Sequence, residues 1–245
     1  MRPIISTIAL VAATTLAGCA GASHDVAPSN ASAHVAASPS VGRIVEGDLD
    51  ISNETSLERF ENLEIVTGTL TIAGNTRLQN LDGLERLRAV KHLVIRENLG
   101  LTDIQALHGL RHAKSVTIEK NPRLENLHGL ESLKKLDRLV VADNGIFCTS
   151  GVGGLLEVGE LVVSRNRRLL SLRGFSNLDS ADTVTIVDNP RVSARTGFLL
   201  ELRRVTGKLE IQRNAGLGPH EVQALERRID HEARAQQGDV QPGSG

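Results

Sequence analysis

One asparagine recurs along this chain at a nearly constant interval. Successive members of the series are 22, 23, 23, 23, 22, 23 and 25 residues apart, and each follows a short segment of alternating apolar residues. The series is Asn53, Asn75, Asn98, Asn121, Asn144, Asn166, Asn189 and Asn214. A fixed period in the twenties is typical of a solenoid, whose coils cannot bury their apolar faces singly and must stack. The period constrains the architecture closely and the function only weakly.

The repeat unit predicts one strand and one tight return path per coil. Its consensus is Leu-x-Ile-x-x-Asn-x-x-Leu-x-x-Leu-x-Gly-Leu-x-x-Leu-x-x-Val-x-x. Apolar residues alternate before the asparagine, as in a half-buried strand, and recur at every third position after it, as in a 3₁₀-like path. We therefore predict a mainly β repeat solenoid, an eight-coil right-handed β-helix or leucine-rich-repeat-like stack with one parallel sheet. The expected inward pairs are Leu49 and Ile51, Leu70 and Ile72, Leu93 and Ile95, Val116 and Ile118, Leu139 and Val141, Leu161 and Val163, Val184 and Ile186, and Leu209 and Ile211.

The asparagines themselves are predicted to be structural. A short amide side chain can satisfy backbone groups where the chain leaves a strand, and identical amides can stack from coil to coil. A row of ligand-binding or metal-binding amides is the alternative. Eight asparagines, one in each coil, favour an asparagine ladder.

The residue before the asparagine alternates in charge over six successive coils. The sequence places there Glu97, Lys120, Asp143, Arg165, Asp188 and Arg213. Neighbouring coils are close enough for ion pairs, so we predict an ion-pair ladder along one edge of the sheet. A charged docking strip is the alternative, but alternating signs cancel at a distance.

The chain opens with a predicted targeting segment over residues 1–18. Arg2 supplies a positive start, and Ile4–Leu16 is a mostly apolar run too short to span a bilayer. The run leads into Leu16-Ala17-Gly18-Cys19, which resembles the lipobox of bacterial lipoproteins. The alternative is an ordinary secretory signal with an incidental cysteine.

The lipobox resemblance implies that the chain is cut before Cys19 and that Cys19 is lipidated. The mature protein would then be attached to the membrane by its lipid without spanning it. Ala20 follows in place of the Asp that retains such lipoproteins at the inner membrane, which favours the outer membrane of the cell envelope. The rest of 19–40 is rich in Ala, Ser, His and Pro, and we interpret it as a flexible tether to a solenoid spanning 41–218.

The C-terminal end of the chain breaks the repeat. Pro219 suits a first helical position, and Val222, Leu225 and Ile229 recur on one helical face. Solenoids need an end piece that covers the last apolar coil, so we predict a capping helix over 219–235. A disordered tail is expected over 236–245.

The repeat resembles the receptor L domain, the leucine-rich solenoid of insulin- and growth-factor-type receptors. The resemblance spans Ile44 to Leu217 and is clearest from Gly68 to Leu139, where Gly-x-Leu-x-Ile-x-x-Asn-x-x-Leu-x-x-Leu-x-Gly-Leu recurs. It implies a binding or scaffolding role without catalysis. The chain lacks the cysteine-rich modules that flank these domains in the receptors, so no particular ligand is carried over.

The fifth coil departs from the consensus through a glycine-rich run at 145–154. Phosphate-binding glycine loops need a following helix with Lys and Ser or Thr at fixed spacing, which this run lacks. We predict a local bulge in which Phe147 keeps the first apolar position, a residue is missing just before Gly151, and Cys148 is buried. A ligand-contacting break is the alternative. A second bulge is expected between Ser193 and Arg204.

Composition excludes several functions. A net charge of -1 and a pI near 6.7 give no basic footprint for nucleic acid. Once Cys19 is lipidated, Cys148 has no intrachain disulfide partner. His108, His112 and His128 lack the spacing of a metal site. We therefore expect no metal, no cofactor and no catalytic residues.

The candidate binding face is the outward middle column of the sheet. Its central members are Thr71, Val94, Thr117, Val140, Val162 and Thr185. Four Phe with no Trp or Tyr argue against a surface dominated by aromatic anchors. We predict a lipid-anchored, non-catalytic cell-envelope module that binds a protein or an envelope polymer such as a polysaccharide. The alternative is a structural envelope lipoprotein without a dedicated ligand.

Overall fold

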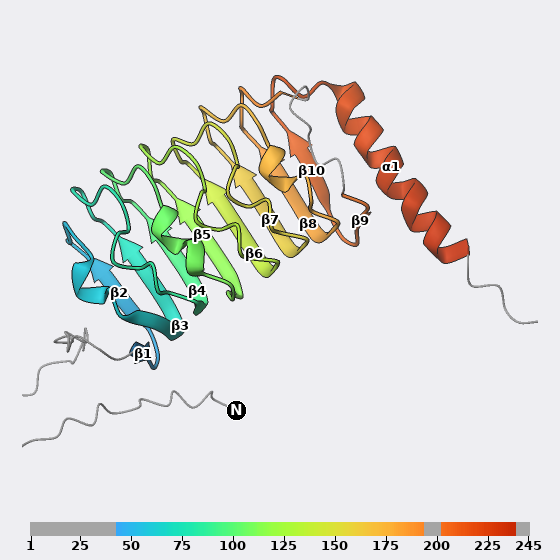
Figure 1. Ribbon diagram of the computed structural model, residues 1–245. Coiled ribbons are helices and arrows are strands. Elements are labelled where there is room, and N and C mark those ends of the chain that lie inside the picture. Colours follow the sequence, from blue (N-terminus) through green and yellow to red (C-terminus); the bar gives the residue numbers. More distant parts are fainter. Residues whose placement is uncertain (1–42, 194–201, 239–245) are drawn as a thin grey trace, which may run out of the picture. The chain divides into compact units, whose positions relative to one another are not determined.

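The repeat folds into successive passes through one parallel sheet, in a computed structural model that describes residues 43–193 and 202–238 (Figure 1). Neighbouring strands follow the chain in the order β1-β3-β4-β5-β6-β7-β8-β10, while β2 also pairs with β3 and β9 with β8. The strands are β1 (Arg43–Val45), β2 (Leu49–Ser52), β3 (Leu63–Ala73), β4 (Ala89–Arg96), β5 (Ser115–Glu119), β6 (Lys135–Ala142), β7 (Glu157–Ser164), β8 (Ser180–Val187), β9 (Arg204–Val205) and β10 (Leu209–Gln212). Short 3₁₀ helices at Glu58–Phe60, Gln105–Gly109 and Arg173–Phe175 lie on the return paths.

The register of the sheet is the one that the sequence period predicts. Leu49 pairs with Leu70, Leu70 with Leu93, and the same column continues through Val116, Leu139, Leu161 and Val184 to Leu209. Seven such pairings link eight passes, so about seven turns of solenoid separate the first pass from the last. This confirms the mainly β solenoid with one parallel sheet.

The expected inward pairs form the core. All are buried except Leu209 and Ile211 in β10, which are half-buried and pack against the core at the end of the stack. The helix α1 (Pro219–Gly238) follows them, and its Leu225 and Ile229 join the same apolar cluster. The helix begins at the predicted Pro219 and ends three residues beyond the expected Ala235. The residues 1–42, 194–201 and 239–245 lie outside the described residues, and with them the targeting segment, Cys19, most of the second bulge and most of the tail.

The consensus glycine is explained by close approach of adjacent coils. Gly83, Gly129 and Gly151 adopt φ values of +109°, +114° and +109°. A Cβ at any of them would overlap the carbonyl oxygen of Leu57, Ile104 or Leu127 in the coil before. A left-handed backbone and the lack of space both require glycine here.

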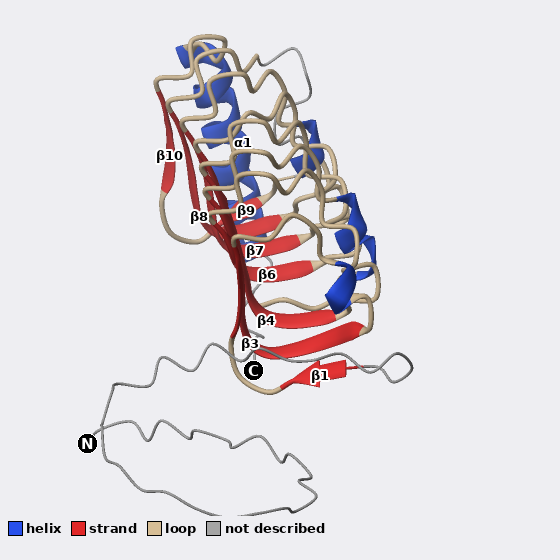
Figure 2. Ribbon diagram, turned by 90° about the vertical axis from the view of Figure 1, so that its left-hand side faces the viewer, coloured by secondary structure: helices blue, strands red, loops and turns tan. Residues whose placement is uncertain are grey.

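Most strands begin before the predicted inward pair, and the sheet bends between the two parts, as Figure 2 shows. In β6 and β7 the pairing skips one position between Leu136–Val158 and Arg138–Glu160. Two amides share one acceptor at the bend, because the N–H groups of Asp137 and Arg138 both donate to Lys114 O. We call this bend, at the strand beginnings, the corner.

Candidate functional site

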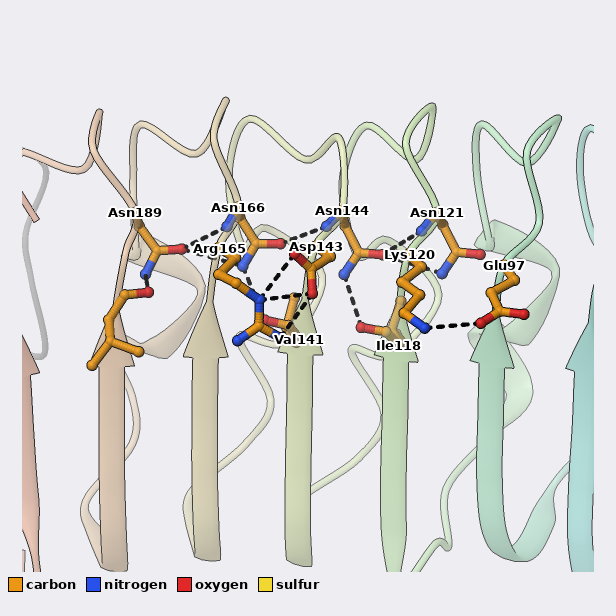
Figure 3. A network of polar contacts seen from close by, with 11 residues as sticks. Glu97, Ile118, Lys120, Asn121, Val141, Asp143, Asn144, Arg165, Asn166 and Asn189 are labelled. Carbon is orange, nitrogen blue, oxygen red and sulfur yellow. Dashed lines mark hydrogen bonds and ion pairs between the residues drawn. The ribbon is translucent and has the colours of Figure 1, made fainter. Parts of the chain in front are cut away.

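The asparagines at the strand ends form a buried column (Figure 3). The backbone N–H of each donates to Oδ1 of the next, at 3.0–3.1 Å from Asn75 through Asn189. Each Nδ2 also donates to a strand carbonyl of the preceding coil, for example Asn144 to Ile118 O at 2.8 Å. The column comprises Asn75, Asn98, Asn121, Asn144, Asn166, Asn189 and Asn214, each at most 5% exposed. Since both ends of the amides are engaged within the protein, this column links coils and presents no free group to a ligand.

Asn53 does not belong to the column, which corrects the sequence-based series. It lies two residues after Ile51, whereas Asn75 lies three residues after Ile72. Glu54 therefore takes the column position, and its backbone N–H donates to Asn75 Oδ1 at 2.7 Å. Asn53 is exposed and has φ +59°.

The charged residues before the asparagines occupy a left-handed turn. Glu97, Lys120, Asp143, Arg165, Asp188 and Arg213 all have φ between 53° and 58°. This conformation turns the chain out of the strand, while their N–H groups still donate to the next coil, as Lys120 does to Ala142 O at 3.0 Å. The side chains consequently reach solvent although strict strand alternation would direct them inward.

The charges form three contacting pairs. Lys120 contacts Glu97 at 2.9 Å, Arg165 contacts Asp143 at 2.8 Å, and Arg213 Nη2 donates to Asp188 Oδ2 at 2.9 Å. The hydrogen bond from Lys120 lowers the pKa of Glu97 and raises the pKa of Lys120. Among the described residues, no contact joins Lys120 to Asp143, so the first and second pairs are not connected. The second and third pairs still interact electrostatically, because Asp188 adds to the effect of Asp143 in raising the pKa of Arg165.

The predicted binding column lies on the outward face of the sheet. Thr71 pairs with Val94, and the register continues through Thr117, Val140 and Val162 to Thr185. Its side chains are half-buried among their neighbours, and Val140 is only 9% exposed. The column therefore presents a row of short side chains that project little beyond the neighbouring side chains of the sheet face.

Two ion pairs frame the centre of this face. Arg138 contacts Glu160 at 3.1 Å on one side of Val140, and the Asp143–Arg165 pair lies beyond Ala142 on the other. Ala142 itself is 3% exposed. We call the small apolar area formed by Val140 and Ala142 between these two ion pairs the apolar window.

The glycine-rich segment of the fifth coil differs from the sequence interpretation. Ile146, not Phe147, occupies the first inward position and is fully buried. Phe147 is half-buried, and the Arg168 guanidinium lies 3.9 Å from its ring centroid. The missing residue falls directly after Asn144, because Phe147 N–H donates to Glu125 O as Glu125 N–H donates to Thr102 O.

The same shift changes the environment of Cys148. It is a free, half-buried thiol, so the expectation of a buried cysteine is wrong. Thr149 takes the buried leucine position instead, and its Oγ1 accepts a hydrogen bond from Gly174 N–H at 3.0 Å. The segment is thus hydrogen-bonded to both neighbouring coils.

The histidines occupy separate environments. Nδ1 of His128 lies 2.9 Å from Glu131 Oε1, and that of His108 lies 3.2 Å from Gln105 O. Within residues 43–193 and 202–229, no cluster of His, Cys, Asp and Glu could hold a metal ion. In the same segments, no helix combines the length and apolarity needed to cross a membrane.

The corner contains two hollows that the sequence alone did not indicate. The larger, about 860 Å3, lies over the beginnings of β4–β6 and is lined mainly by basic side chains. The other, about 430 Å3, lies over β6–β9 and is lined by both acidic and basic side chains. Lys135 lines both hollows. The basic residues come from successive coils, so only folding the sequence at its period brings them together.

Comparison with known families agrees with this architecture. Residues 43–152 match the family model of the receptor L domain. This segment, from β1 to the glycine-rich run, is a receptor L domain-like solenoid, which confirms the resemblance noted in the repeat. Receptor L domains are ligand-binding modules and not enzymes. No curated protein and no solved structure matches the chain.

Proposed function

We propose that this protein is a lipid-anchored, non-catalytic module of the bacterial cell envelope, held at the outer membrane, which binds a protein or an envelope polymer. The observation that carries the binding role is the outward sheet face, where Thr117, Val140 and Val162 lie in register between two ion pairs. Small side chains on a regular sheet give a partner a surface that needs little reordering. The receptor L domain match supports a binding role.

Substitution at the centre of this face tests the binding role. Val140→Arg places a long cation in the apolar window, and we expect it to weaken saturable binding of the full chain to purified cell envelopes. Leu99→Arg is a matched control, because Leu99 is a 54% exposed apolar residue in a loop beyond the strand ends. Both variants should keep the wild-type circular dichroism spectrum. Equal binding by wild type and Val140→Arg would favour a structural lipoprotein without a dedicated ligand.

The lipid anchor rests on the Leu16-Ala17-Gly18-Cys19 motif. Cys19→Ala should prevent metabolic labelling with a fatty-acid probe and move the protein from the membrane fraction to the soluble fraction. Retention of the unlabelled variant in the membrane fraction would contradict the anchor. Protease treatment of intact and permeabilised cells then distinguishes a cell-surface solenoid from a periplasmic one.

A further inference from the structure

The larger hollow at the corner arises from a local change in the sheet. β5 has 5 residues, whereas its neighbours β4 and β6 have 8 each. Where the first half of β5 would lie, the sheet pairing consists of a single bridge between His112 and Ala89. Ala113 stands where the adjacent coils place the buried Val90 and Leu136, and this smaller residue is half-buried and lines the hollow.

Four cations around this hollow have no ion-pair partner within the described part of the chain: Lys91, Arg111, Lys114 and Lys134. All four are exposed. The fifth, Lys135, contacts Glu157 at 2.7 Å. The hollow's own carboxylate, Glu131, accepts a hydrogen bond from Gly129 N–H at 2.8 Å and contacts His128 at 2.9 Å. The four cations are therefore available to an external anion.

The cations are spread along the solenoid axis. Lys114 N–H donates to Lys91 O, and Arg111 N–H donates to Arg88 O, so these side chains stand on adjacent coils. Lys134 lies one coil further on. Neighbouring parallel strands are about 4.8 Å apart. Cations on successive coils can therefore each pair with a different anionic group, which suits a ligand with several anionic groups in a row better than a single anion.

We propose that this corner hollow binds a linear acidic polysaccharide that carries carboxylate groups along its length. The corner hollow lies on a different surface from Val140. The inference rests on the proposed function in one respect only, namely that the partner is a polymer. Val90 and Ala113, with the aliphatic stems of the lysines, supply an apolar floor for the sugar rings. The exposed ammonium and guanidinium groups pair with the carboxylates.

Other anionic partners fit this hollow less well. Same-face side chains of an extended peptide repeat at about 6.6–6.8 Å, which does not match the coil spacing of about 4.8 Å. Single-stranded nucleic acid is held mainly by stacking on a series of aromatic rings, whereas the imidazole of His112 is the single ring among the side chains that line the hollow. A bilayer is flat, whereas the cations surround a concavity.

Binding of polygalacturonate to the full chain tests the proposal. Its methyl ester, poly-glutamate and phosphatidylglycerol vesicles serve as the competing probes. We expect polygalacturonate to bind most tightly, and increasing salt to weaken it. No binding of polygalacturonate, or tighter binding of poly-glutamate or vesicles, would overturn the assignment.

Two charge-matched variants locate the site. The corner variant combines Lys91→Gln, Arg111→Gln, Lys114→Gln and Lys134→Gln, and we expect its affinity to fall at least about tenfold. The loop variant removes the same charge through Arg77→Gln, Arg123→Gln, Arg167→Gln and Arg191→Gln, exposed arginines in loops beyond the strand ends. It should bind within about threefold of wild type. Equal losses in the two variants, or no loss in the corner variant, would contradict the site.

Ala113→Leu tests the shape of the site with every charge kept. The larger side chain should fill the floor and weaken polygalacturonate binding, while the adjacent Val90 and Leu136 show that the column accepts such a residue. Undiminished binding by Ala113→Leu would contradict a role for the hollow. Val140→Arg should retain polymer binding, so failure of the proposed sheet-face function and failure of this inference give different results.

Discussion

The two ends of the strands use polar residues in opposite ways. At the strand ends, buried asparagines form hydrogen bonds to neighbouring coils, and the charged residues beside them form ion pairs across coils. At the corner, where the strands begin, four exposed cations, Lys91 and Lys114 among them, line a hollow and have no ion-pair partner among the described residues. Polar groups that are fully engaged hold a solenoid together, whereas unpaired charges are free for recognition. Chemistry of the side chain alone does not separate these roles.

The largest effect should come from the asparagine column. Asn121→Ala removes the acceptor of Asn98 N–H and the donor to Ile95 O, both buried. Unsatisfied buried groups cost about 1–3 kcal/mol each, so we expect a loss of about 3 kcal/mol in the free energy of unfolding measured with urea.

Asn53→Ala is the matched control, because Asn53 is exposed and outside the column. Its loss should be about 1 kcal/mol or less, from the left-handed backbone alone. Similar losses in the two variants would show that the column does not link the coils.

An intermediate effect should come from the left-handed turn at Asp143. Asp143→Val and Asp143→Gly both remove the ion pair with Arg165, but only valine is strained at φ +56°. We expect the valine variant to be less stable than the glycine variant by about 1–2 kcal/mol in urea unfolding. Equal stability of the two variants would show that the left-handed backbone at this position does not strain a valine.

The smallest effect should come from the exposed Glu97–Lys120 pair. Lys120→Glu should lower the melting temperature slightly, and the further change Glu97→Lys should restore much of it, since this pair is separate from the next. No decrease on the single swap would show that the pair does not stabilise the protein.

The contribution of this pair should also depend on pH. The folded-state pKa of Glu97 lies below its ordinary 4.5, so its stabilisation is present above that value and is lost as the pH falls through the folded pKa. The pKa of Lys120 is raised above 10.5, so its stabilisation is lost as the pH rises through the folded pKa. The melting-temperature difference between wild type and Glu97→Gln should therefore be largest between these limits. A difference that persists at strongly acidic pH would contradict the ion pair.

The sequence predicts the sheet more completely than the surface. Alternation and period identify every inward pair and its register, because a shift of one residue would reverse the burial of the whole strand. The same period wrongly predicts that Asn53 belongs to the asparagine column. Asn53 has the expected residue type, but it lies one residue closer to Ile51 than Asn75 lies to Ile72. In the fifth coil, the residue after Asn144 could be deleted without loss of the apolar pattern, so hydrogen bonding alone locates the deletion.

The corner hollow escapes sequence analysis for a physical reason. Its cations are about one period apart, and a net charge of -1 conceals them. Aligning the chain at its period places Arg88, Arg111 and Lys134 in one column, and Lys91 and Lys114 in another. The hollow itself depends on how the short side chain of Ala113 packs beside a truncated β5, which no local pattern specifies.

Melting temperature as a function of polygalacturonate concentration tests most directly the division between a structural edge and a binding corner. Wild type and the corner variant should melt at the same temperature without polymer, and only wild type should melt higher as polymer is added, because a ligand of the folded state stabilises it by mass action. A lower melting temperature of the corner variant without polymer would show that the cations hold the fold. An equal rise in both proteins would show that the polymer binds elsewhere.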